Sequence, residues 1–502
     1  METILPGIEL AFTFSNILLA VVGLAVGIFI GAIPGLNVPM AVALALPFTF
    51  ALTPLSALAL LIGIYKGGTY GGSISAVLIN VPGTPAAAAT AADGHALARQ
   101  GKAGKALRMS LFASVVGEII ADIALIALAI PLAAFALNFG PAEYFAVGVF
   151  ALTIIGLVSG GNLIKGLIAG TAGVLLATVG LDPLIGVERL TFDIRALSGG
   201  IDFIALIIGM FAIAELLIQV ERSATNRISQ RIAEDRGDDP AASRVSRAEF
   251  RAAFPAMLRG TPIGILIGAI PGLGSAVAAY LSYGLNKRFS RNPDQYGKGA
   301  IDGVAAAESA NNAVCSSTMI PLLALGVPGD VITAIMLGAL TIHGIIPGPA
   351  LFDQQADLIT GLFILMALTS VLHLVVGWAG LGLFVRALDL PRAVLFPAVF
   401  LVCLIGTYVA TSSFFAVYTM LGVGVVGYLM LKVGIPVAPL LIGFILGPII
   451  EVKLRQALLI SRGDITVFIT RPISAILLLL TLAVIVTIIV QSIRNARAGS
   501  KS

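Results

Sequence analysis

Long apolar tracts separated by short charged stretches are the dominant pattern along this chain. No charged residue occurs from Leu10 to Tyr65. Further tracts without charge lie at 144–164, 261–286, 331–352, 358–385, 393–431 and 473–493. A helix that spans a bilayer needs about 20 such residues, and several tracts can hold more than one segment. The pattern therefore predicts an all-α, polytopic membrane protein with roughly ten to twelve embedded segments.

Composition supports this prediction and excludes other classes of protein. Hydrophobic residues make up 58% of the 502 residues and charged residues only 11%, whereas soluble domains contain about 25% charged residues. Such a chain cannot form the surface of a soluble enzyme or a nucleic-acid-binding protein. The net charge of +4 belongs to loops, where Lys and Arg set membrane topology, and indicates no acidic partner. The two cysteines, Cys315 and Cys403, lie in apolar sequence and are interpreted as small buried hydrophobes.

Two halves of the chain resemble each other on either side of a charged stretch at 221–259. Residues 27–36 (GIFIGAIPGL) and 264–273 (GILIGAIPGL) differ at one position only, and a Val-Pro-Gly motif follows later in each half, at 81–83 and 327–329. Such internal repeats are typical of transporter folds. Each repeat is predicted to contain a re-entrant hairpin, with Pro-Gly at its turn, and a helix broken at Val-Pro-Gly.

Loop charges indicate that the two repeats face opposite sides of the membrane. The stretch after the first hairpin turn is neutral at 46–55, whereas the stretch after the second, at 286–299, is rich in Lys and Arg. After the Val-Pro-Gly motifs the difference in charge is reversed. Basic residues follow the first copy at 99–108, and none follows the second at 341–352. The positive-inside rule then predicts inverted-topology repeats. The basic residues at 453–471 fall where this scheme places an outside loop, and do not fit it.

The predicted organisation has four parts. Residues 1–220 form the first repeat, with a hairpin at 15–53 and a broken helix at 72–93, and residues 221–259 form a cytoplasmic loop. Residues 260–455 form the second repeat, with a hairpin at 261–286 and a broken helix at 300–342, and residues 456–502 form a C-terminal helix and basic tail.

The four chain breaks are the strongest pointer to a binding site. A break inside the membrane leaves backbone groups unpaired, which is tolerated only where protein or a water-filled cavity receives them. At each break a half-helix begins, so its free amides attract an anion, as Gly35, Leu36, Gly272 and Gly274 could do for a carboxylate. Polar side chains follow the breaks and could bind a cation, or they could simply cap the helices that begin there; they are Asn37, Thr84, Ser275 and Asp330.

Two polar, small-residue stretches precede the Val-Pro-Gly motifs. The first, 65–76, contains Lys66 as a candidate partner for a carboxylate, and the second, 305–319, contains Glu308. Both stretches could line a cavity or serve close helix packing. Glu118 and Asp122 lie one helical turn apart and could relay protons, although pairing with loop arginines or a place near the interface is the preferred interpretation. The predicted substrate- and ion-binding set is Pro34, Gly35, Leu36, Asn37, Lys66, Thr69, Ser73, Pro82, Gly83, Thr84, Pro271, Gly272, Gly274, Ser275, Asn311, Asn312, Pro328, Gly329 and Asp330.

No catalytic pattern accompanies these features. The chain contains no Walker A sequence, its three histidines are scattered, and no nucleophile or metal cluster stands out. The sequence therefore predicts neither an enzyme nor a bound cofactor, and energy must come from an ion gradient or another subunit. An ion channel, a membrane-embedded enzyme and a scaffold subunit are the alternatives to a transporter.

The ordered motifs resemble one known family. They are the paired GAIPGL hairpins, the stretch 80–90 (NVPGTPAAAAT) followed by Asp93-Gly94, the stretch 308–314 (ESANNAV), and LGVPGD at 325–330 with HGIIPGP at 343–349. From about residue 15 to 490 the chain is similar to the large membrane subunit of the bacterial tripartite tricarboxylate transporters. This resemblance implies a transporter in the bacterial inner membrane that works with a small membrane subunit and a periplasmic solute-binding protein. It also implies citrate or another carboxylate as substrate and coupling to a cation, generally Na+ with the proton as alternative, and it permits an elevator-type motion by analogy with other two-hairpin transporters.

Overall fold

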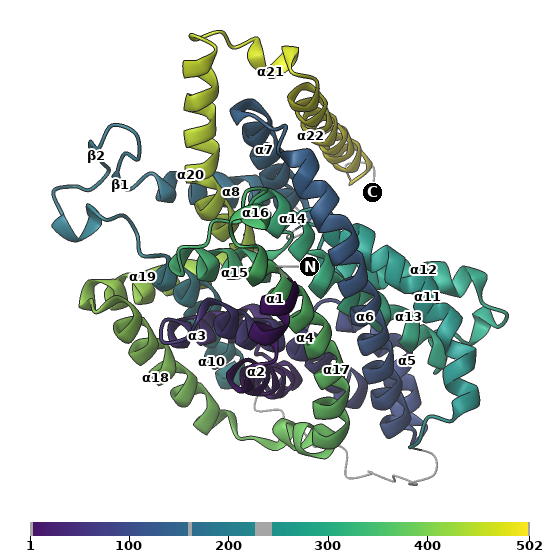
Figure 1. The fold of residues 1–502 in the computed structure, drawn as a ribbon. Helices are drawn as coiled ribbons and strands as arrows, with labels where there is room; N and C mark the ends of the chain where they lie inside the picture. The colour runs from purple at the N-terminus through teal and green to yellow at the C-terminus, as the bar shows by residue number, and fades with distance from the viewer. Residues whose placement is uncertain (1–3, 159–162, 226–242, 500–502) are drawn as a thin grey trace.

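The computed structural model describes residues 4–158, 163–225 and 243–499, and these residues are almost entirely helical (Figure 1). Eight helices in this part of the chain are long and apolar enough to cross a membrane, and five shorter apolar helices accompany them. The prediction of an all-α, multi-pass membrane protein is confirmed.

The first half of the chain contains α1 (Ile4–Ala11), α2 (Phe14–Ala32), α3 (Val38–Thr49), α4 (Pro54–Ile79), α5 (Ala87–Arg99), α6 (Ala103–Ala136), α7 (Pro141–Val158), α8 (Leu163–Ala177), β1 (Gly180–Leu181), β2 (Glu188–Arg189), η1 (Arg195–Leu197), α9 (Phe203–Ile207), η2 (Ile208–Ile213) and α10 (Ala214–Thr225). The second half contains α11 (Arg247–Ala269), α12 (Gly274–Phe289), η3 (Pro293–Gln295), α13 (Ile301–Ser317), α14 (Met319–Leu325), α15 (Val331–Ile342), α16 (Leu351–Gln354), α17 (Ala356–Arg386), η4 (Ala387–Asp389), α18 (Arg392–Thr411), α19 (Phe414–Lys432), α20 (Val437–Ile460), α21 (Val467–Thr470) and α22 (Pro472–Gly499).

Each GAIPG sequence lies at the turn between two helices, and the two turns occupy equivalent positions in the two halves. Helix α2 ends at Ala32 and α3 begins at Val38, while α11 ends at Ala269 and α12 begins at Gly274. The turns need glycine, because Gly35 has a φ of +95° and Gly272 a φ of +89°. Proline at positions 34 and 271 has no backbone N–H and so ends the preceding helix.

Glycines bring the first helix of each hairpin into close contact with the helix that precedes Val-Pro-Gly. On α2, a Cβ added to Gly27 would lie 2.4 Å from the carbonyl oxygen of Ile64 on α4. On α11, a Cβ added to Gly264 would lie 2.4 Å from the carbonyl oxygen of Ala310 on α13. Small residues allow such close approach of helices inside a membrane, where apolar burial cannot drive association.

Helices α4 and α13 form the centre of the molecule. Every residue of α4 from Leu55 to Val77 is buried, as is every residue of α13 from Gly303 to Ser317. The two helices meet where the Cys315 thiol lies 3.4 Å from the hydroxyl of Thr69. Each of these residues lies 12 positions before its Val-Pro-Gly motif, at Val81 and Val327. The central helices therefore touch at matching positions of the two halves.

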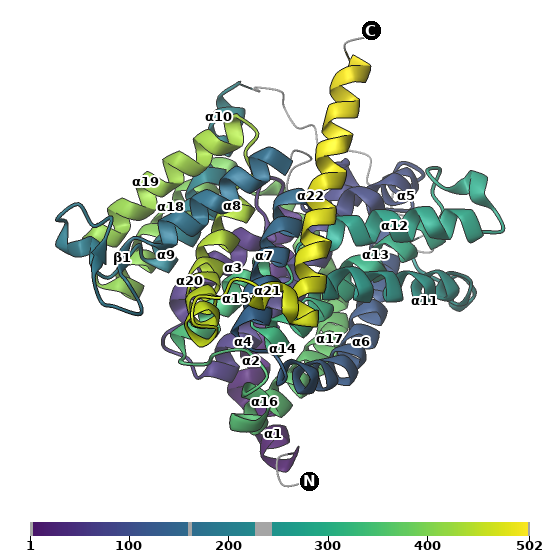
Figure 2. The ribbon, with the colours of Figure 1, turned by 90° about the horizontal axis from the view of Figure 1, so that it is seen from above.

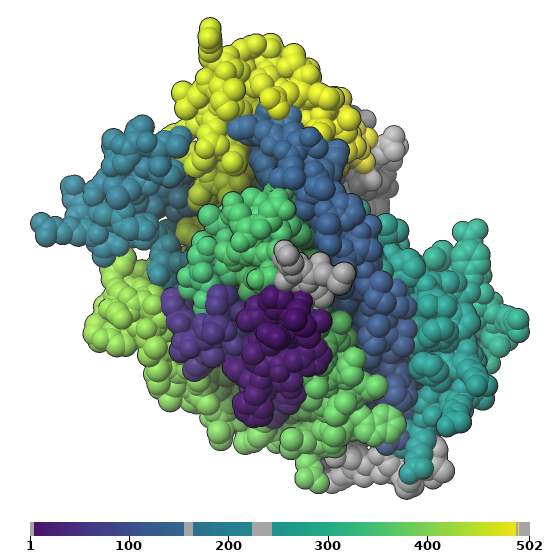
Figure 3. Space-filling model, viewed as in Figure 1, coloured from purple at the N-terminus to yellow at the C-terminus, as the bar shows by residue number. Residues whose placement is uncertain are grey.

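The other helices pack around this pair. On one side of the molecule α11 and α12 lie beside α13, together with α5, and α18 and α19 lie on the other side (Figure 2). In the space-filling view the second hairpin forms one edge, in teal, and the C-terminal residues form another, in yellow (Figure 3). Large apolar side chains of α18, such as Val394 and Val409, are exposed, as expected for a surface that faces lipid.

The charged stretch at 221–259 was predicted to be a loop, but part of it is helical. Residues 226–242 lie outside the described residues, but α11 already begins at Arg247, so residues 247–259 are helical. The helix begins there because Ser246 and Glu249 form a capping box, in which each side chain accepts a hydrogen bond from the other residue's backbone N–H.

A small two-stranded sheet lies in the loop between α8 and α9. Asp182 anchors this loop to α20, because its carboxylate accepts a hydrogen bond of 2.7 Å from Arg455. That bond and the backbone N–H groups of Leu184 and Ile185 lower the pKa of Asp182 from 3.8 to about 2. The anchor is therefore charged over the whole physiological pH range.

Candidate functional site

The chain breaks of each half contact each other. In the second half, the backbone N–H of Gly272 at the hairpin turn donates to the carbonyl oxygen of Gly329 at 2.7 Å. In the first half, a Cβ added to Gly83 would lie 2.3 Å from the carbonyl oxygen of Gly31, at the end of α2. The hairpin and the Val-Pro-Gly break of one half thus form a single structural unit, held together by backbone groups.

Two of the four polar residues that follow the breaks, Asn37 and Asp330, act as helix caps. The side chain of Asn37 accepts from the N–H of Met40 at 2.8 Å, and Asp330 accepts from the N–H of Thr333 at 2.8 Å. Thr84 accepts from the N–H of Ala87 at 3.3 Å, but it is not the cap of α5, whose N-cap is Ala86. The fourth, Ser275, lies in the first turn of α12. A hydroxyl, amide or carboxylate oxygen has more than one lone pair, so these side chains can still offer a lone pair to a ligand.

The two halves expose their breaks in opposite ways. Val81 and Pro82 of the first Val-Pro-Gly motif are exposed, with Val81 at 41%, whereas Val327 and Pro328 of the second are buried, with Val327 at 3%. The hairpin turns show the reverse order. At the equivalent positions just before the turns, Ile33 is 5% exposed, whereas Ile270 is 40% exposed. One motif and the opposite turn are therefore accessible in this conformation.

Asp330 also connects the two halves. Its carboxylate accepts a short hydrogen bond from the hydroxyl of Tyr65, which lies on α4 in the first half. Its other oxygen accepts from the backbone N–H and the hydroxyl of Thr333. Groups from both halves therefore bind the carboxylate at the second break. If α4 moved relative to α15, the hydrogen bond from Tyr65 would have to break.

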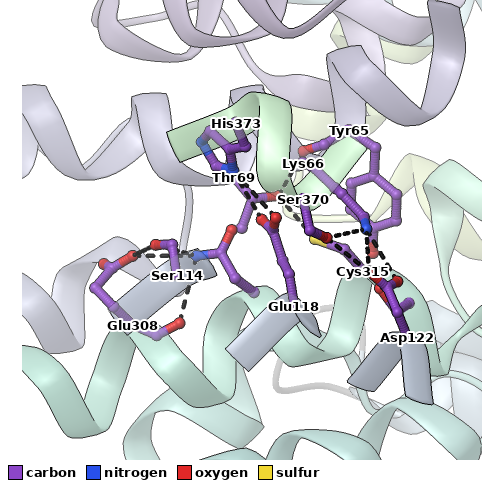
Figure 4. A network of polar contacts seen from close by, with 12 residues as sticks. Tyr65, Lys66, Thr69, Ser114, Glu118, Asp122, Glu308, Cys315, Ser370 and His373 are labelled. Carbon is purple, nitrogen blue, oxygen red and sulfur yellow. Dashed lines mark hydrogen bonds and ion pairs between the residues drawn. The ribbon is translucent and has the colours of Figure 1, made fainter. Parts of the chain in front are cut away.

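Lys66 does not point toward the breaks but is bound inside the protein (Figure 4). Its side chain is fully buried, and its ammonium lies 3.0 Å from Asp122, 2.9 Å from the carbonyl oxygen of Met366 and 2.7 Å from the hydroxyl of Ser370. An ammonium has three donors, and these contacts use them all. The candidate carboxylate partner of Lys66 is thus a side chain of the protein itself in this conformation.

The predicted pairing of Glu118 and Asp122 with loop arginines was wrong for the part of the chain that the structure describes. Both carboxylates are buried in the helical core and have other partners. Asp122 binds Lys66, and Glu118 lies 3.0 Å from Nδ1 of His373 on α17. The partners lie far apart in sequence, so no local pattern around residues 118–122 could have identified them. The lysine within the apolar sequence of α4 was the available signal. An unpaired charge there would be costly, so a buried carboxylate partner was to be expected.

The other predicted polar residues of α4 and α13 are buried against each other. The hydroxyl of Ser73 donates to Glu308, and Asn312 donates to the hydroxyl of Ser114 at 2.8 Å. Both amide atoms of Asn311 are buried without a hydrogen-bond partner. Figure 4 shows that Glu308 with Ser114, Glu118 with His373, and Lys66 with Asp122 follow one another through the core. No local sequence pattern pointed to His373, Ser114 or Tyr65.

The described part of the chain contains no group of three or more His, Cys, Asp or Glu residues that could hold a metal ion. Candidate ligands for a cation are instead hydroxyl, amide and single carboxylate oxygens.

Comparison with known proteins places the chain in one family. The family described as "Tripartite tricarboxylate transporter TctA family" matches residues 17–442. The chain is 38% identical to the "Uncharacterized 52.8 kDa protein in TAR-I ttuC' 3'region" of Agrobacterium vitis, over 98% of this chain and 96% of that protein. It is 42% identical to the "Uncharacterized protein in TAR-II ttuC' 3'region" of the same organism, over 47% of this chain and 97% of that protein. No solved structure matches the chain.

Proposed function

Because the chain belongs to the tripartite tricarboxylate transporter TctA family, we propose that it carries citrate or another small organic carboxylate across the bacterial inner membrane by cation-coupled secondary transport. Na+ is the proposed coupling ion, with the proton as the alternative. The proposed partners are a small membrane subunit and a periplasmic solute-binding protein that delivers the substrate.

The opposite exposure of the paired breaks is the observation that carries this proposal. A transporter built from inverted repeats binds its substrate between the repeats and opens the site to one side at a time. In any one conformation of such a protein, equivalent breaks differ in their exposure. Here Val81 is exposed and Val327 is buried. The contact of α4 with α13 at matching positions, Thr69 and Cys315, supports a two-fold relation between the repeats. An elevator-type motion of the hairpins and broken helices is the proposed form of alternating access.

The proposed substrate site comprises the amides of Gly35, Leu36, Gly272 and Gly274, at the starts of the half-helices α3 and α12, where a carboxylate is favoured. In this conformation the N–H groups of Leu36 and Gly272 donate to the carbonyl oxygens of Ile33 and Gly329, so substrate binding would have to release them. The polar residues Asn37, Thr84, Ser275 and Asp330 are proposed to bind the cation or the substrate. This division leaves the anion to backbone N–H groups at the starts of half-helices, which is common where helices are interrupted inside a membrane. The cation is left to side-chain oxygens.

Uptake into proteoliposomes tests the proposal. The vesicles would contain this chain and its small membrane subunit, with labelled citrate and the binding protein outside and an inward Na+ gradient present or absent. Accumulation that requires both the gradient and the binding protein is expected. Success with another carboxylate would change only the substrate. Unsaturable flux that needs no gradient would contradict the proposal and favour an ion channel.

Asp330→Asn is expected to reduce Na+-driven uptake at least about tenfold while leaving membrane insertion unchanged. Asparagine keeps the helix cap but removes the charge, so the helix start is preserved. Initial uptake rates at several Na+ concentrations would measure the effect. Thr84→Ser, which keeps the hydroxyl at the matching position of the first half, is the control. A normally inserted Asp330→Asn protein with unchanged Na+ dependence would exclude a role for this carboxylate in coupling.

A further inference from the structure

Glu308 is a buried carboxylate surrounded only by neutral donors. Its side chain lies on α13 and is fully buried. The hydroxyls of Ser73 and Thr90 make short hydrogen bonds to Oε1, and Oε2 accepts from the Ser114 hydroxyl at 3.1 Å and from Asn312 Nδ2 at 3.2 Å. These groups come from four helices, α4, α5, α6 and α13. They complement the acceptor atoms of an ionised carboxylate but do not neutralise its charge.

The neighbouring buried carboxylates are arranged differently. Asp122 has the Lys66 ammonium at 3.0 Å, and Glu118 has the His373 ring at 3.0 Å. Within residues 4–158, 163–225 and 243–499, no ion pair joins Glu308 to a lysine, arginine or histidine. A buried charge without a partner of opposite sign is strongly unfavourable. The charge of Glu308 must therefore be balanced by a proton or by a cation from outside the side chains described.

The oxygen atoms around Glu308 are suited to a small cation. A hydroxyl has one donor and two acceptor lone pairs, so Ser73, Thr90 and Ser114 can each donate to the carboxylate and still offer a lone pair to an ion. Hard cations prefer such oxygen ligands. One carboxylate among neutral oxygens carries a single negative charge, which a monovalent cation balances.

Unpartnered buried polar atoms lie at the same place and point independently to a ligand. Asn312 uses its Nδ2 on Glu308 and Ser114, but its Oδ1 is buried without a hydrogen-bond partner. Both amide atoms of Asn311 are also unpartnered, and this residue lies three positions after Glu308, on the same side of α13. Buried polar groups are rarely left without a hydrogen-bond partner. The oxygen of a side-chain amide can bind a cation instead.

We propose that Glu308, with Ser73, Thr90, Ser114 and Asn312, forms a binding site for a small monovalent cation, Na+. The inference rests on the proposed cation-coupled transport and gives the coupling ion a site separate from the four breaks. Ser73 lies near the end of α4 and Thr90 near the start of α5, on either side of the break at Val81. An ion bound to both would hold these two helices in a fixed relation, and so order the exposed break for the substrate.

Thermal unfolding of the purified full-length protein tests this site without any transport. The buried thiols of Cys315 and Cys403 become reactive on unfolding, so a thiol-reactive fluorophore reports the midpoint, Tm. Na+ would be titrated against choline at constant ionic strength, and K+ in a parallel series. A ligand that binds only the folded state raises Tm in a saturable manner, by about 3 °C at a hundredfold excess over its Kd.

Variants then locate the ion. Glu308→Gln is expected to abolish the Na+-dependent rise in Tm, and Thr90→Val, which keeps the side-chain shape, to raise the half-saturating Na+ concentration about tenfold. Ser309→Ala is the matched control, because this neighbouring hydroxyl on α13 is equally buried but donates to the carbonyl oxygen of Ala306 instead. Its Na+ response should equal that of the wild type. Thr90→Val decides the question if Glu308→Gln does not fold.

The outcomes separate this site from the proposed transport function. A Na+ response that survives in both Glu308→Gln and Thr90→Val overturns the site, even if the wild type takes up carboxylate with Na+. A wild type that responds to pH but not to Na+ also overturns it, in favour of a proton on Glu308. A Glu308-dependent Na+ response in a protein that transports no carboxylate supports the site and rejects only the proposed function.

Discussion

Lys66→Met is expected to lower the free energy of unfolding by about 3–5 kcal/mol, because it leaves Asp122 as a buried charge without its cationic partner. The ammonium is fully buried and also binds the carbonyl oxygen of Met366 and the hydroxyl of Ser370. Methionine has nearly the same length and leaves no large cavity, so the loss reports on charge and hydrogen bonding. The shift in Tm of the purified protein, with the thiol-reactive probe, measures the effect.

The double variant Lys66→Met/Asp122→Asn distinguishes a structural role of Lys66 from a role in substrate binding. Removing both charges should recover most of the lost stability, since the penalty comes from the unpaired partner. If Lys66 is purely structural, the double variant should also recover carboxylate uptake. Recovery of stability without uptake would instead assign Lys66 to the substrate path. A single variant with an unchanged Tm would contradict the buried ion pair.

Gly27→Ala is expected to destabilise the protein by about 2–3 kcal/mol, through overpacking of α2 against α4. The added methyl group would lie 2.4 Å from the carbonyl oxygen of Ile64 and 2.8 Å from the backbone nitrogen of Gly68. These are backbone atoms, so the helices themselves must separate. Because α2 leads into the turn at Gly35, the same substitution should also reduce uptake. Tm and initial uptake rate are the two measurements.

Two further glycine substitutions control for this prediction. Gly264→Ala on α11 should cost about as much as Gly27→Ala, because its methyl group would lie 2.4 Å from the carbonyl oxygen of Ala310. Gly284→Ala on α12 would meet no atom within 4 Å and should be neutral or stabilising by up to about 1 kcal/mol, from helix propensity alone. Equal effects at positions 27 and 284 would show that propensity, not helix contact, is being measured.

Much of the architecture could be predicted from local sequence. Charge-free tracts identify membrane helices, because a charge in the hydrocarbon interior is costly over any stretch of chain. The breaks at Pro34-Gly35 and Pro271-Gly272 were equally readable, since proline lacks an N–H and only glycine adopts a φ near +90° without strain. Where a short polar residue follows a break, as at Asn37 and Asp330, helix capping is a local property as well.

The pairing of buried charges was decided by the tertiary structure alone. Glu118 and Asp122 were readable as two carboxylates on one helix face, but their partners, His373 and Lys66, lie on other helices. The same holds for Glu308, whose donors come from four different helices. Local rules fix where a helix begins and ends, whereas the neighbour of a buried side chain depends on how helices distant in the sequence pack. For this reason the sequence by itself determined the embedded segments and their breaks. Only the packing of α4, α6, α13 and α17 decided which buried charges are paired and that Glu308 has no ion-pair partner among the described residues.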